Sequence, residues 1–360
     1  MNTLNIALLA GDGIGPEIMD QAVKVVDAIA NKHKLTIQYS TALVGATAID
    51  QTGQPYPEET HQTCMKADAV LFGAIGHPKF DNDPNAKVRP EQGLLAMRKK
   101  LGLFANVRPV SVYASLLDRS PLKRERIEGA DFVVVRELTG GIYFGQPRGR
   151  SEDGTKAFDT CVYEVYEIER IVKYAFETAM QRDKKLCMVD KANVLATSRL
   201  WRSVTDRIAK EYPEVAYSKM FVDNAAMQLI VNPTQFDVIV TGNMFGDILT
   251  DEASVLGGSL GLLPSSSVGK HTAIFEPIHG SYPQATGKNI ANPMGMILSA
   301  AMLFDHLQMT AIGTEIRNAV EYCINKGLVT EDLAKTNEKT YTTTEIGDAV
   351  AQVISSSILV

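Results

Sequence analysis

Short apolar runs bounded by glycine, proline or polar residues recur along the chain and alternate with amphipathic stretches. We predict buried strands over residues 5–10, 35–39, 69–73, 131–136, 185–189 and 236–241. The later runs are strongly apolar or β-branched, which is typical of strands covered on both faces. Between the first two runs, residues 16–32 repeat apolar positions at helical spacing. This alternation predicts an α/β fold with much parallel sheet.

Three further segments have patterns of their own. Residues 140–163 are rich in glycine and aromatic residues around a central turn, and we interpret them as a long β-hairpin that forms an arm for another subunit. Residues 292–306 are mostly apolar and predict a buried helix. A last helix is expected over residues 343–354, with Thr342 and Glu345 as its capping box.

The composition is that of a globular protein that can bury a substantial core, in one large domain or two lobes. The 360 residues are 45% hydrophobic and 22% charged. The formal net charge of −6 and the lack of a basic patch exclude a general attraction to nucleic acid or to anionic membranes. No uninterrupted apolar run reaches the roughly 18 residues that a membrane-spanning helix needs.

The first residues and the cysteines favour a cytoplasmic protein. Residues 1–10 are apolar but lack a basic segment, and Gly11-Asp12-Gly13 interrupts them before they reach the length of a signal peptide. The cysteines are too scattered for a redox or zinc pair, at Cys64, Cys161, Cys187 and Cys323. We therefore expect a cytoplasmic location, although four cysteines alone do not exclude export.

A glycine-rich turn joins the first predicted strand to the first helix, with the sequence GDGIGPE from Gly11 to Glu17. Glycines in this position let backbone N–H groups approach an anion or a cofactor. The turn is not the dinucleotide fingerprint, because the sixth position is Pro16 rather than glycine. A proline instead suits the first turn of a helix. A cofactor-binding turn and a purely structural tight turn both remain open.

Two carboxylates lie four residues apart on a predicted helix that begins at Gly246. Asp247 and Asp251 therefore share one face of that helix. Unpaired carboxylates would repel each other, and a hard divalent cation such as Mg²⁺ or Mn²⁺ would relieve the repulsion through oxygen ligands. The alternative is a solvated acidic face, which the small apolar residues that follow make less favoured.

Five side chains are candidates for the substrate chemistry. Arg98, Arg108 and Arg136 fall at or beside the ends of predicted elements, where converging guanidinium groups suit bidentate binding of a dicarboxylate. Lys191 follows a strand directly and can act as a base if its surroundings remove its proton, and Tyr143 can donate a proton. Spacing alone favours plainer alternatives for each of them, namely a surface cation or an ordinary hairpin aromatic.

Five long segments carry a family resemblance that covers nearly the whole chain. They are RELTGGIYFG from Arg136, DKANVL from Asp190, VDNAAMQL from Val222, TGNMFGDILTDEAS from Thr241 and HGSYPQATGKNIANP from His279. In this order they resemble the β-decarboxylating hydroxyacid dehydrogenases, which include isocitrate, isopropylmalate and tartrate dehydrogenases. The resemblance implies that family's α/β two-domain fold, with a large mixed sheet that is not a Rossmann fold. Residues 1–103 and 254–360 would bind the cofactor, and residues 104–253 would hold the substrate and the dimer arm.

The segment RPEQGLLAMR resembles the isopropylmalate branch of that family. Its substrate-facing residues would be Glu91, Leu94, Leu95 and Arg98. They fall on neighbouring helical turns, so that an apolar patch lies beside an arginine and suits an isopropyl group on a malate core. The resemblance implies NAD-dependent oxidation and metal-assisted decarboxylation of 3-isopropylmalate in leucine biosynthesis. Related reactions on D-malate, tartrate or homoisocitrate remain alternatives, as does a silent relative that only binds metal or dinucleotide.

The resemblance also implies roles for the candidate residues. The carboxylate-binding residues would be Arg98, Arg108 and Arg136, and the ligands of Mg²⁺ or Mn²⁺ would be Asp223, Asp247 and Asp251. Lys191 would remove the proton of the substrate hydroxyl, and Tyr143 would protonate the enolate carbon. In such family members the lysine and the first aspartate enter the site from the partner subunit, so a homodimer with shared active sites is expected.

The cofactor contacts follow from the same resemblance. Asn193 would lie near the nicotinamide of NAD, and Val194 near the isopropyl group. The remaining contacts would be Ile14, Glu276, His279, Gly280, Ser281, Tyr282, Pro283, Gln284, Ala285, Gly287 and Asn292. One departure bears on the cofactor, because the family pattern HGSAPDIAGK has an acidic residue where this chain has the amide Gln284. NAD stays the expected cofactor, since no lysine or arginine is there to attract the 2′-phosphate of NADP.

Overall fold

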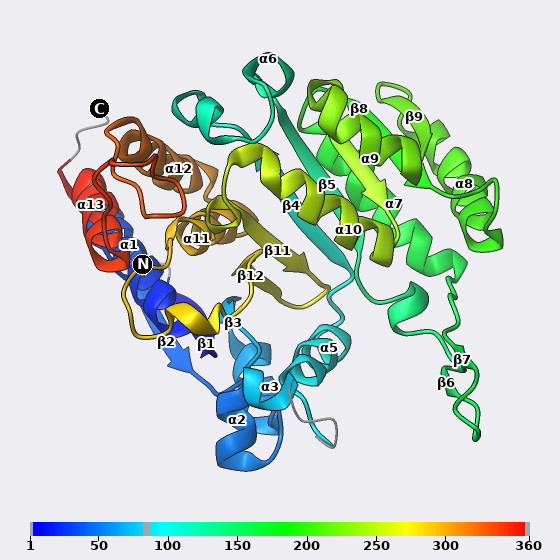
Figure 1. The fold of residues 1–360 in the computed structure, drawn as a ribbon, viewed down its shortest axis with the longest axis horizontal. Helices are drawn as coiled ribbons and strands as arrows, with labels where there is room; N and C mark the ends of the chain where they lie inside the picture. The colour runs from blue at the N-terminus through cyan, green and yellow to red at the C-terminus, as the bar shows by residue number, and fades with distance from the viewer. Residues whose placement is uncertain (1–2, 82–86, 357–360) are drawn as a thin grey trace. The chain divides into compact units, whose positions relative to one another are not determined.

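The computed structural model describes residues 3–81 and 87–356, and the chain divides into two compact units (Figure 1). The first unit combines Met1–Gly102 with Gly257–Val360, and the second is the continuous segment Leu103–Leu256. The chain therefore leaves the first unit once, builds the whole of the second and then returns. Each unit has its own strands and helices.

Five strands of the first unit lie in the order β2-β1-β3-β12-β11. They are β1 (Thr3–Gly11), β2 (Thr36–Thr41), β3 (Ala69–Ala74), β11 (Pro264–Val268) and β12 (Ala273–Pro277). β1 pairs in parallel with β2 and β3, β12 pairs in parallel with β3, and β11 is antiparallel to β12. Every residue of β3 is buried, as expected for a central strand.

The helices of the first unit cover these strands. They are α1 (Gly15–His33), α2 (Gly45–Thr52), α3 (Glu58–Lys66), α4 (Pro78–Asp81), α5 (Pro90–Lys100), α11 (Met294–His306), α12 (Thr310–Asn325) and α13 (Thr343–Ser355). α11 is buried on nearly all sides and contacts β11, β12 and α12. α13 begins with a capping box in which Thr342 and Glu345 bond each other's backbone N–H groups. Two short 3₁₀ turns, η6 (Leu260–Leu262) and η7 (Pro283–Ala285), complete this unit.

Five strands of the second unit lie side by side in the order β4-β5-β10-β8-β9. They are β4 (Ala105–Ser111), β5 (Asp131–Glu137), β8 (Lys185–Asp190), β9 (Ala216–Phe221) and β10 (Val238–Thr241). Among these five strands, only the pairing of β4 with β5 is antiparallel. The α-helices are α6 (Arg124–Ile127), α7 (Val165–Met180), α8 (Ala196–Ile208), α9 (Val222–Val231) and α10 (Asn243–Ser254). Phe132, Ile239 and Leu249 are fully buried in its core, which ties β5, β10 and α10 together.

Most of the predicted elements are confirmed. The six predicted strands correspond to β1, β2, β3, β5, β8 and β10, and the predicted helices to α1, α11 and the capped α13. The α/β class with both parallel and antiparallel pairs is also confirmed. The helix that carries Asp247 begins at Asn243 rather than at Gly246, because Gly242 is the last extended residue before it.

The predicted hairpin over residues 140–163 is wrong in its extent. Only β6 (Gly149–Arg150) and β7 (Ala157–Phe158) pair, with Gly149 opposite Phe158, and Gly141–Tyr143 forms a 3₁₀ turn, η2. Figure 1 shows this short ribbon extending away from the rest of its unit. The two strands are exposed throughout, so no buried face fixes a longer pairing.

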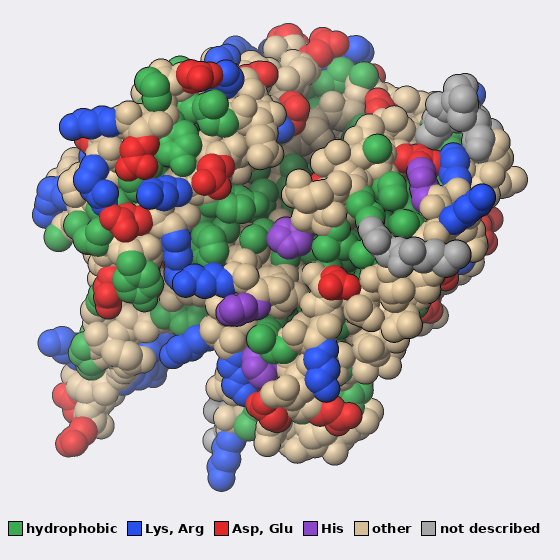
Figure 2. All heavy atoms as spheres, turned by 180° about the vertical axis from the view of Figure 1, so that it is seen from behind, with side chains coloured by type: hydrophobic (Ala, Val, Ile, Leu, Met, Phe, Trp, Pro, Cys, Tyr) green, Lys and Arg blue, Asp and Glu red, His purple; other side chains and the backbone are tan. Residues whose placement is uncertain are grey.

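Charged side chains of both signs lie on the surface, which agrees with the formal net charge of only −6. Figure 2 shows acidic and basic side chains interspersed over much of the face that it displays. None of the helices in the described ranges is both long and apolar enough to cross a membrane.

Candidate active site

A buried arginine organises the second unit's polar cluster. Arg136, the second-last residue of β5, has a side chain only 2% exposed, and its Nη1 forms an ion pair with Oδ1 of Asp247 on α10. Its Nε and Nη2 donate to Oδ1 of Asn243 at 3.1 and 2.8 Å. A Cβ at Gly246 would lie 2.6 Å from Cγ of Arg136. Glycine at that position therefore lets α10 pass closely over the arginine.

A second arginine, on the neighbouring strand β4, contacts Asp247 and also Asp251. Arg108, in the middle of β4, donates through Nη1 to Oγ1 of Thr250 at 2.5 Å and to Oδ1 of Asp251 at 3.4 Å. Its Nη2 lies 3.8 Å from Oδ1 of Asp247. Two guanidinium groups and two carboxylates thus share one site, in which each charge offsets another. Asp251 keeps its side chain 68% exposed and can accept further partners.

The predicted proton donor lies in this cluster. Tyr143, at the end of η2, donates its hydroxyl to Oδ2 of Asp247 at 2.8 Å, and Cζ of Arg136 lies 5.9 Å from its ring centroid. Burial, followed by the hydrogen bond to Asp247, raises the pKa of Tyr143 above its ordinary value. The phenol therefore carries its proton at neutral pH and can donate it to a bound substrate.

Asn243 links these groups to the turn that carries Tyr143. Its Nδ2 donates to the carbonyl of Gly140 at 3.1 Å, while its Oδ1 accepts from Arg136. Its backbone N–H, at the first residue of α10, donates to Oη of Tyr163 at 2.7 Å. One side chain therefore sets the relative positions of β5, η2 and the start of α10. The sequence alone assigned Asn243 no role.

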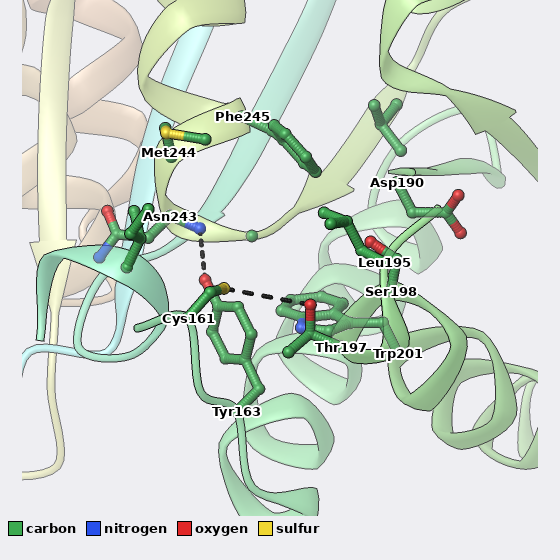
Figure 3. Close-up of a pocket in the computed structure, with 13 residues that line it drawn as sticks. Cys161, Tyr163, Asp190, Leu195, Thr197, Ser198, Trp201, Asn243, Met244 and Phe245 are labelled. Carbon is green, nitrogen blue, oxygen red and sulfur yellow. Dashed lines mark hydrogen bonds between the residues drawn. The ribbon is translucent and has the colours of Figure 1, made fainter. Parts of the chain in front are cut away.

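A small cavity of about 170 Å³ lies behind this junction, lined mainly by apolar side chains (Figure 3). Tyr163 and Trp201 meet edge to face there, with ring centroids 5.4 Å apart. Figure 3 shows the Tyr163 hydroxyl directed at the start of α10, and Cys161 directed at Thr197. The aromatic pair thus holds the hydroxyl that caps the helix.

Lys191 and Asp223 form a separate pair in the same unit. Nζ of Lys191, directly after β8, lies 2.5 Å from Oδ1 of Asp223 in the first turn of α9. That hydrogen bond lowers the pKa of Asp223. The backbone N–H of Lys191 donates to Oγ of Ser198 at 3.1 Å, which fixes the turn after the strand. Val194, three residues further on, is 63% exposed.

The predicted three-carboxylate metal site is not assembled within one chain. Among residues 3–81 and 87–356, no group of three or more His, Cys, Asp or Glu side chains is placed to hold a metal ion. Asp247 and Asp251 do lie together, and they offer the hard oxygen ligands that Mg²⁺ and Mn²⁺ prefer. These two carboxylates therefore offer part of the donor set that such a cation prefers.

The first unit contains a cavity of about 520 Å³. Its lining residues are Ile14, Ser259, Leu260, Gly261, His279, Gly280, Tyr282, Ile290, Ala291, Asn292, Glu331 and Asp332. Nδ1 of His279 lies 2.9 Å from the carbonyl oxygen of Gly280, which can only accept, so the proton lies on Nδ1. Nε2 is buried and has no hydrogen-bond partner in the described structure. Burial lowers the pKa of His279 and keeps it neutral, with Nε2 as an acceptor for a ligand.

The glycine-rich turn positions the wall of this cavity. The N–H of Ile14 donates to the carbonyl of Ser281 at 2.9 Å, and Gly13 approaches so closely that a Cβ there would lie 2.0 Å from that oxygen.

Two carboxylates of the turn hold the backbone of neighbouring segments. Glu17 accepts from the backbone N–H groups of Gly287 and Asn289. The carboxylate of Asp12 is buried and accepts from the N–H groups of Ala46 and Gly76. The turn thus has a structural role that also shapes the cavity.

The structure distributes the other predicted residues over both units. Arg98 lies in the last turn of α5, as predicted, and its Nη2 is 4.0 Å from Oε1 of Glu276. Leu94 and Leu95 are half-buried on the same helix, and Gln284 is exposed and does not line the cavity. Five of the predicted cofactor contacts do line it, namely Ile14, His279, Gly280, Tyr282 and Asn292. No sequence signal marks the lining residues 259–261 and 331–332, which carry no recognisable motif, and residues 290–291 were not singled out within the segment that begins at His279.

The second unit's cluster of paired arginines and carboxylates and the first unit's cavity are features typical of an α/β enzyme that binds small molecules. The sequence profile described as isocitrate/isopropylmalate dehydrogenase matches residues 5–350, and the chain belongs to that family. Its members include oxidative decarboxylases, as the resemblance implied. The expected fold class, with a large mixed sheet, is confirmed by this match and by the solved structures below.

Several relatives are similar over almost their full length. A 3-isopropylmalate dehydrogenase from Bacteroides fragilis (strain YCH46) is 57% identical, covering 95% of this chain and 96% of the relative. One from Wolinella succinogenes is 54% identical, covering 98% of each chain. Among solved structures, isocitrate dehydrogenase from Methylococcus capsulatus has a TM-score of 0.86 at 33% identity, covering 98% and 99% of the two chains.

We predict that Asn243→Ala destabilises the second unit by about 2–3 kcal/mol, because Nε and Nη2 of the buried Arg136 lose their acceptor and the carbonyl of Gly140 loses its donor. Urea unfolding followed by tryptophan fluorescence measures this directly, since the single tryptophan, Trp201, lies in that unit. The control is Asn232→Ala at an exposed site of the same unit, expected to stay within about 0.5 kcal/mol. Equal unfolding curves for the two variants would contradict the conclusion that Asn243 positions β5, η2 and the start of α10.

Proposed function

We propose that this chain is a 3-isopropylmalate dehydrogenase that oxidises (2R,3S)-3-isopropylmalate with NAD and decarboxylates the product to 4-methyl-2-oxopentanoate and CO₂, in leucine biosynthesis. The observation that carries the proposal is the cluster of Arg108, Arg136, Asp247, Asp251 and Tyr143. It combines cations for a dicarboxylate, carboxylates for a metal ion and a protonated phenol. The relatives named above are themselves called 3-isopropylmalate dehydrogenases.

The arginines would bind the two carboxylates of the malate core. Arg108 and Arg136 are both more than nine-tenths buried and already oriented by hydrogen bonds, so binding costs them little side-chain entropy. Arg98 is expected to bind the same core from α5. Leu94 and Leu95, which are half-buried beside it, would face the isopropyl group, together with Val194.

Mg²⁺ or Mn²⁺ would be held by Asp247 and Asp251, with Asp223 as a third ligand. When bound, the cation would polarise the substrate hydroxyl and its neighbouring carboxylate, and the nicotinamide would accept the hydride. Lys191 would take the hydroxyl proton, and Tyr143 would return a proton to the carbon that loses CO₂. Burial and the hydrogen bond to Asp247 raise the pKa of Tyr143, so the phenol holds its proton at neutral pH. The carboxylate of Asp247 orients this phenol.

NAD is expected to bind in the cavity of the first unit. The free acceptor Nε2 of His279 suits the amino group of an adenine, and Ile14, Leu260 and Ile290 offer apolar contacts to its faces. The first unit would therefore serve as the cofactor-binding domain, and the second as the substrate and dimerisation domain. Glu276, Ser281, Pro283, Ala285 and Gly287 would support the cofactor loop, and Asn193 would approach the nicotinamide.

A homodimer with shared active sites is part of the proposal. Exposed apolar side chains gather on the adjoining helices α9 and α10 and just after them, at Met227, Ile230, Val231, Ile248 and Val255. Such a surface on a second unit that also exposes Asp223 fits an interface between two copies. The partner's Lys191 and Asp223 would complete the cluster at Asp247. The four cysteines are all free, which fits a cytoplasmic location.

The test of the function is reduction of NAD by the purified protein with 3-isopropylmalate, D-malate, tartrate, homoisocitrate and isocitrate, each with Mg²⁺ and with chelator. We expect metal-dependent turnover with kcat/KM for isopropylmalate at least about tenfold above the others, since the apolar group contributes roughly 1–3 kcal/mol of discrimination. Preference for another hydroxy acid would leave the proposed mechanism intact and overturn the assignment of 3-isopropylmalate as the substrate. No turnover with any of them would indicate a silent relative.

If the exposed apolar residues of α9 and α10 form the dimer interface, a charge placed among them should separate the two copies. Met227→Asp, at a side chain 57% exposed, should leave each chain folded but shift sedimentation to the monomer and lower turnover at least about tenfold. Met65→Asp, at a side chain 42% exposed on α3 of the first unit, is the matched control and should change neither property. A dimeric Met227→Asp protein with normal turnover would contradict this interface.

A further inference from the structure

We propose that Glu331 selects NAD over NADP by placing a negative charge on the wall of the first unit's cavity, in the absence of an acidic residue at position 284. The inference rests on the proposed function, which assigns this cavity to the dinucleotide. It concerns a residue to which neither the sequence pattern nor the family resemblance assigned a role. It also accounts for the one departure of this chain that left the cofactor preference open.

The cavity has a negative lining. Two of its twelve lining residues are carboxylates, Glu331 and Asp332, and none of them is lysine or arginine. The histidine in the wall does not offset these charges, because burial lowers the pKa of His279. A ligand that adds negative charge to the adenosine end therefore meets repulsion with no cation to balance it.

Asp332 has a structural role that limits its part in recognition. Its Oδ2 accepts from Nδ2 of Asn292 at 3.1 Å and also from the hydroxyl of Ser259, and its Oδ1 accepts from the hydroxyl of Thr330. These bonds hold the segment before Leu333 against two other parts of the cavity wall. The carboxylate of Asp332 is thus already shared among three donors of the protein.

Glu331 differs from its neighbour because its side chain is not engaged. Throughout the described ranges of the chain, no hydrogen bond or ion pair involves the Glu331 carboxylate, although its backbone is fixed by the segment that Asp332 anchors. The side chain is exposed at the wall of the cavity. With the dinucleotide bound in this cavity, the Glu331 carboxylate would accept from a ribose hydroxyl of NAD and repel a phosphate attached to that hydroxyl.

Gln284 cannot supply the discrimination between NAD and NADP. It is exposed and lies outside the set of lining residues, and a neutral amide would not repel a phosphate. An acidic residue bonds the ribose hydroxyls in NAD-binding sites, whereas a basic residue accommodates the 2′-phosphate in NADP-binding sites. A phosphate monoester carries roughly −1.5 to −2 charges at pH 7. A single carboxylate at Glu331 is therefore enough to disfavour NADP without a contact at position 284.

The test is direct binding of NADH and NADPH to the purified protein by titration calorimetry, without substrate or turnover. We expect wild-type protein to bind NADH at least about tenfold more tightly than NADPH. Glu331→Gln should reduce this ratio of affinities at least about threefold, because it removes the repulsion of the 2′-phosphate. Glu331→Lys should reduce the ratio further, because its positive charge also attracts the phosphate. Raising the salt concentration should reduce the wild-type ratio as well, since it screens the repulsion.

The matched control is Glu321→Gln, which removes the same charge from an exposed position on α12 of the same unit, away from the cavity lining. It should leave the ratio unchanged. Equal affinity of wild-type protein for the two nucleotides, or an unchanged ratio in Glu331→Gln, would overturn the inference while leaving the proposed function intact. Binding of neither nucleotide would overturn both. Selective NADH binding without turnover of isopropylmalate would overturn the substrate assignment alone.

Discussion

The arrangement of the second unit depends on the burial of Arg136. A guanidinium that is almost fully removed from water needs partners for its charge and its donors. Asn243 and Asp247 meet that demand from one end of α10, and Gly246 provides the space for the arginine to pass. The start, the direction and the closeness of α10 therefore follow from one side chain of β5.

The same constraint brings the reactive groups together. Because Asp247 is held by Arg136, its other oxygen is free to orient the hydroxyl of Tyr143. Asp251, one helical turn on, then lies beside Arg108 with most of its carboxylate exposed. What the cluster lacks is a base and a third carboxylate. Lys191 and Asp223 have those properties, but they form a separate pair. This division is the reason for proposing that a second copy of the chain completes each site.

The sequence predicts the elements with strong patterns and misses those whose burial is decided by tertiary structure. The apolar runs at β3, β5 and β10 were predictable because strands covered on both faces need such runs. β11 was not, because its sequence PSSSV is polar although every residue of it is buried. The hairpin was overextended because Gly140 and Gly141 pack against the ring of Tyr163 instead of pairing as strand residues, and only residues 149–150 and 157–158 pair.

Among the site residues, motifs identified the charged groups but not their supports. The pairing of Arg136 with Asp247 joins residues far apart in the chain, and the acceptor role of Asn243 depends on a contact that no spacing predicts. Glu331 was missed because a carboxylate in a polar loop carries no local signal. Conversely, Gln284 was noticed as a departure, and only the cavity lining shows that another acid lies on the wall.

The central claim is that each active site combines Tyr143 and Asp247 of one chain with Lys191 and Asp223 of another. The most direct test mixes two inactive variants, Tyr143→Phe and Lys191→Met, after reversible dissociation, and measures turnover of 3-isopropylmalate. Random pairing makes half of the dimers hybrid, each with one intact site, so the account predicts recovery of about a quarter of the wild-type rate. If all four residues belonged to one chain, every site in the mixture would carry a defect, and the absence of recovered activity would contradict the account.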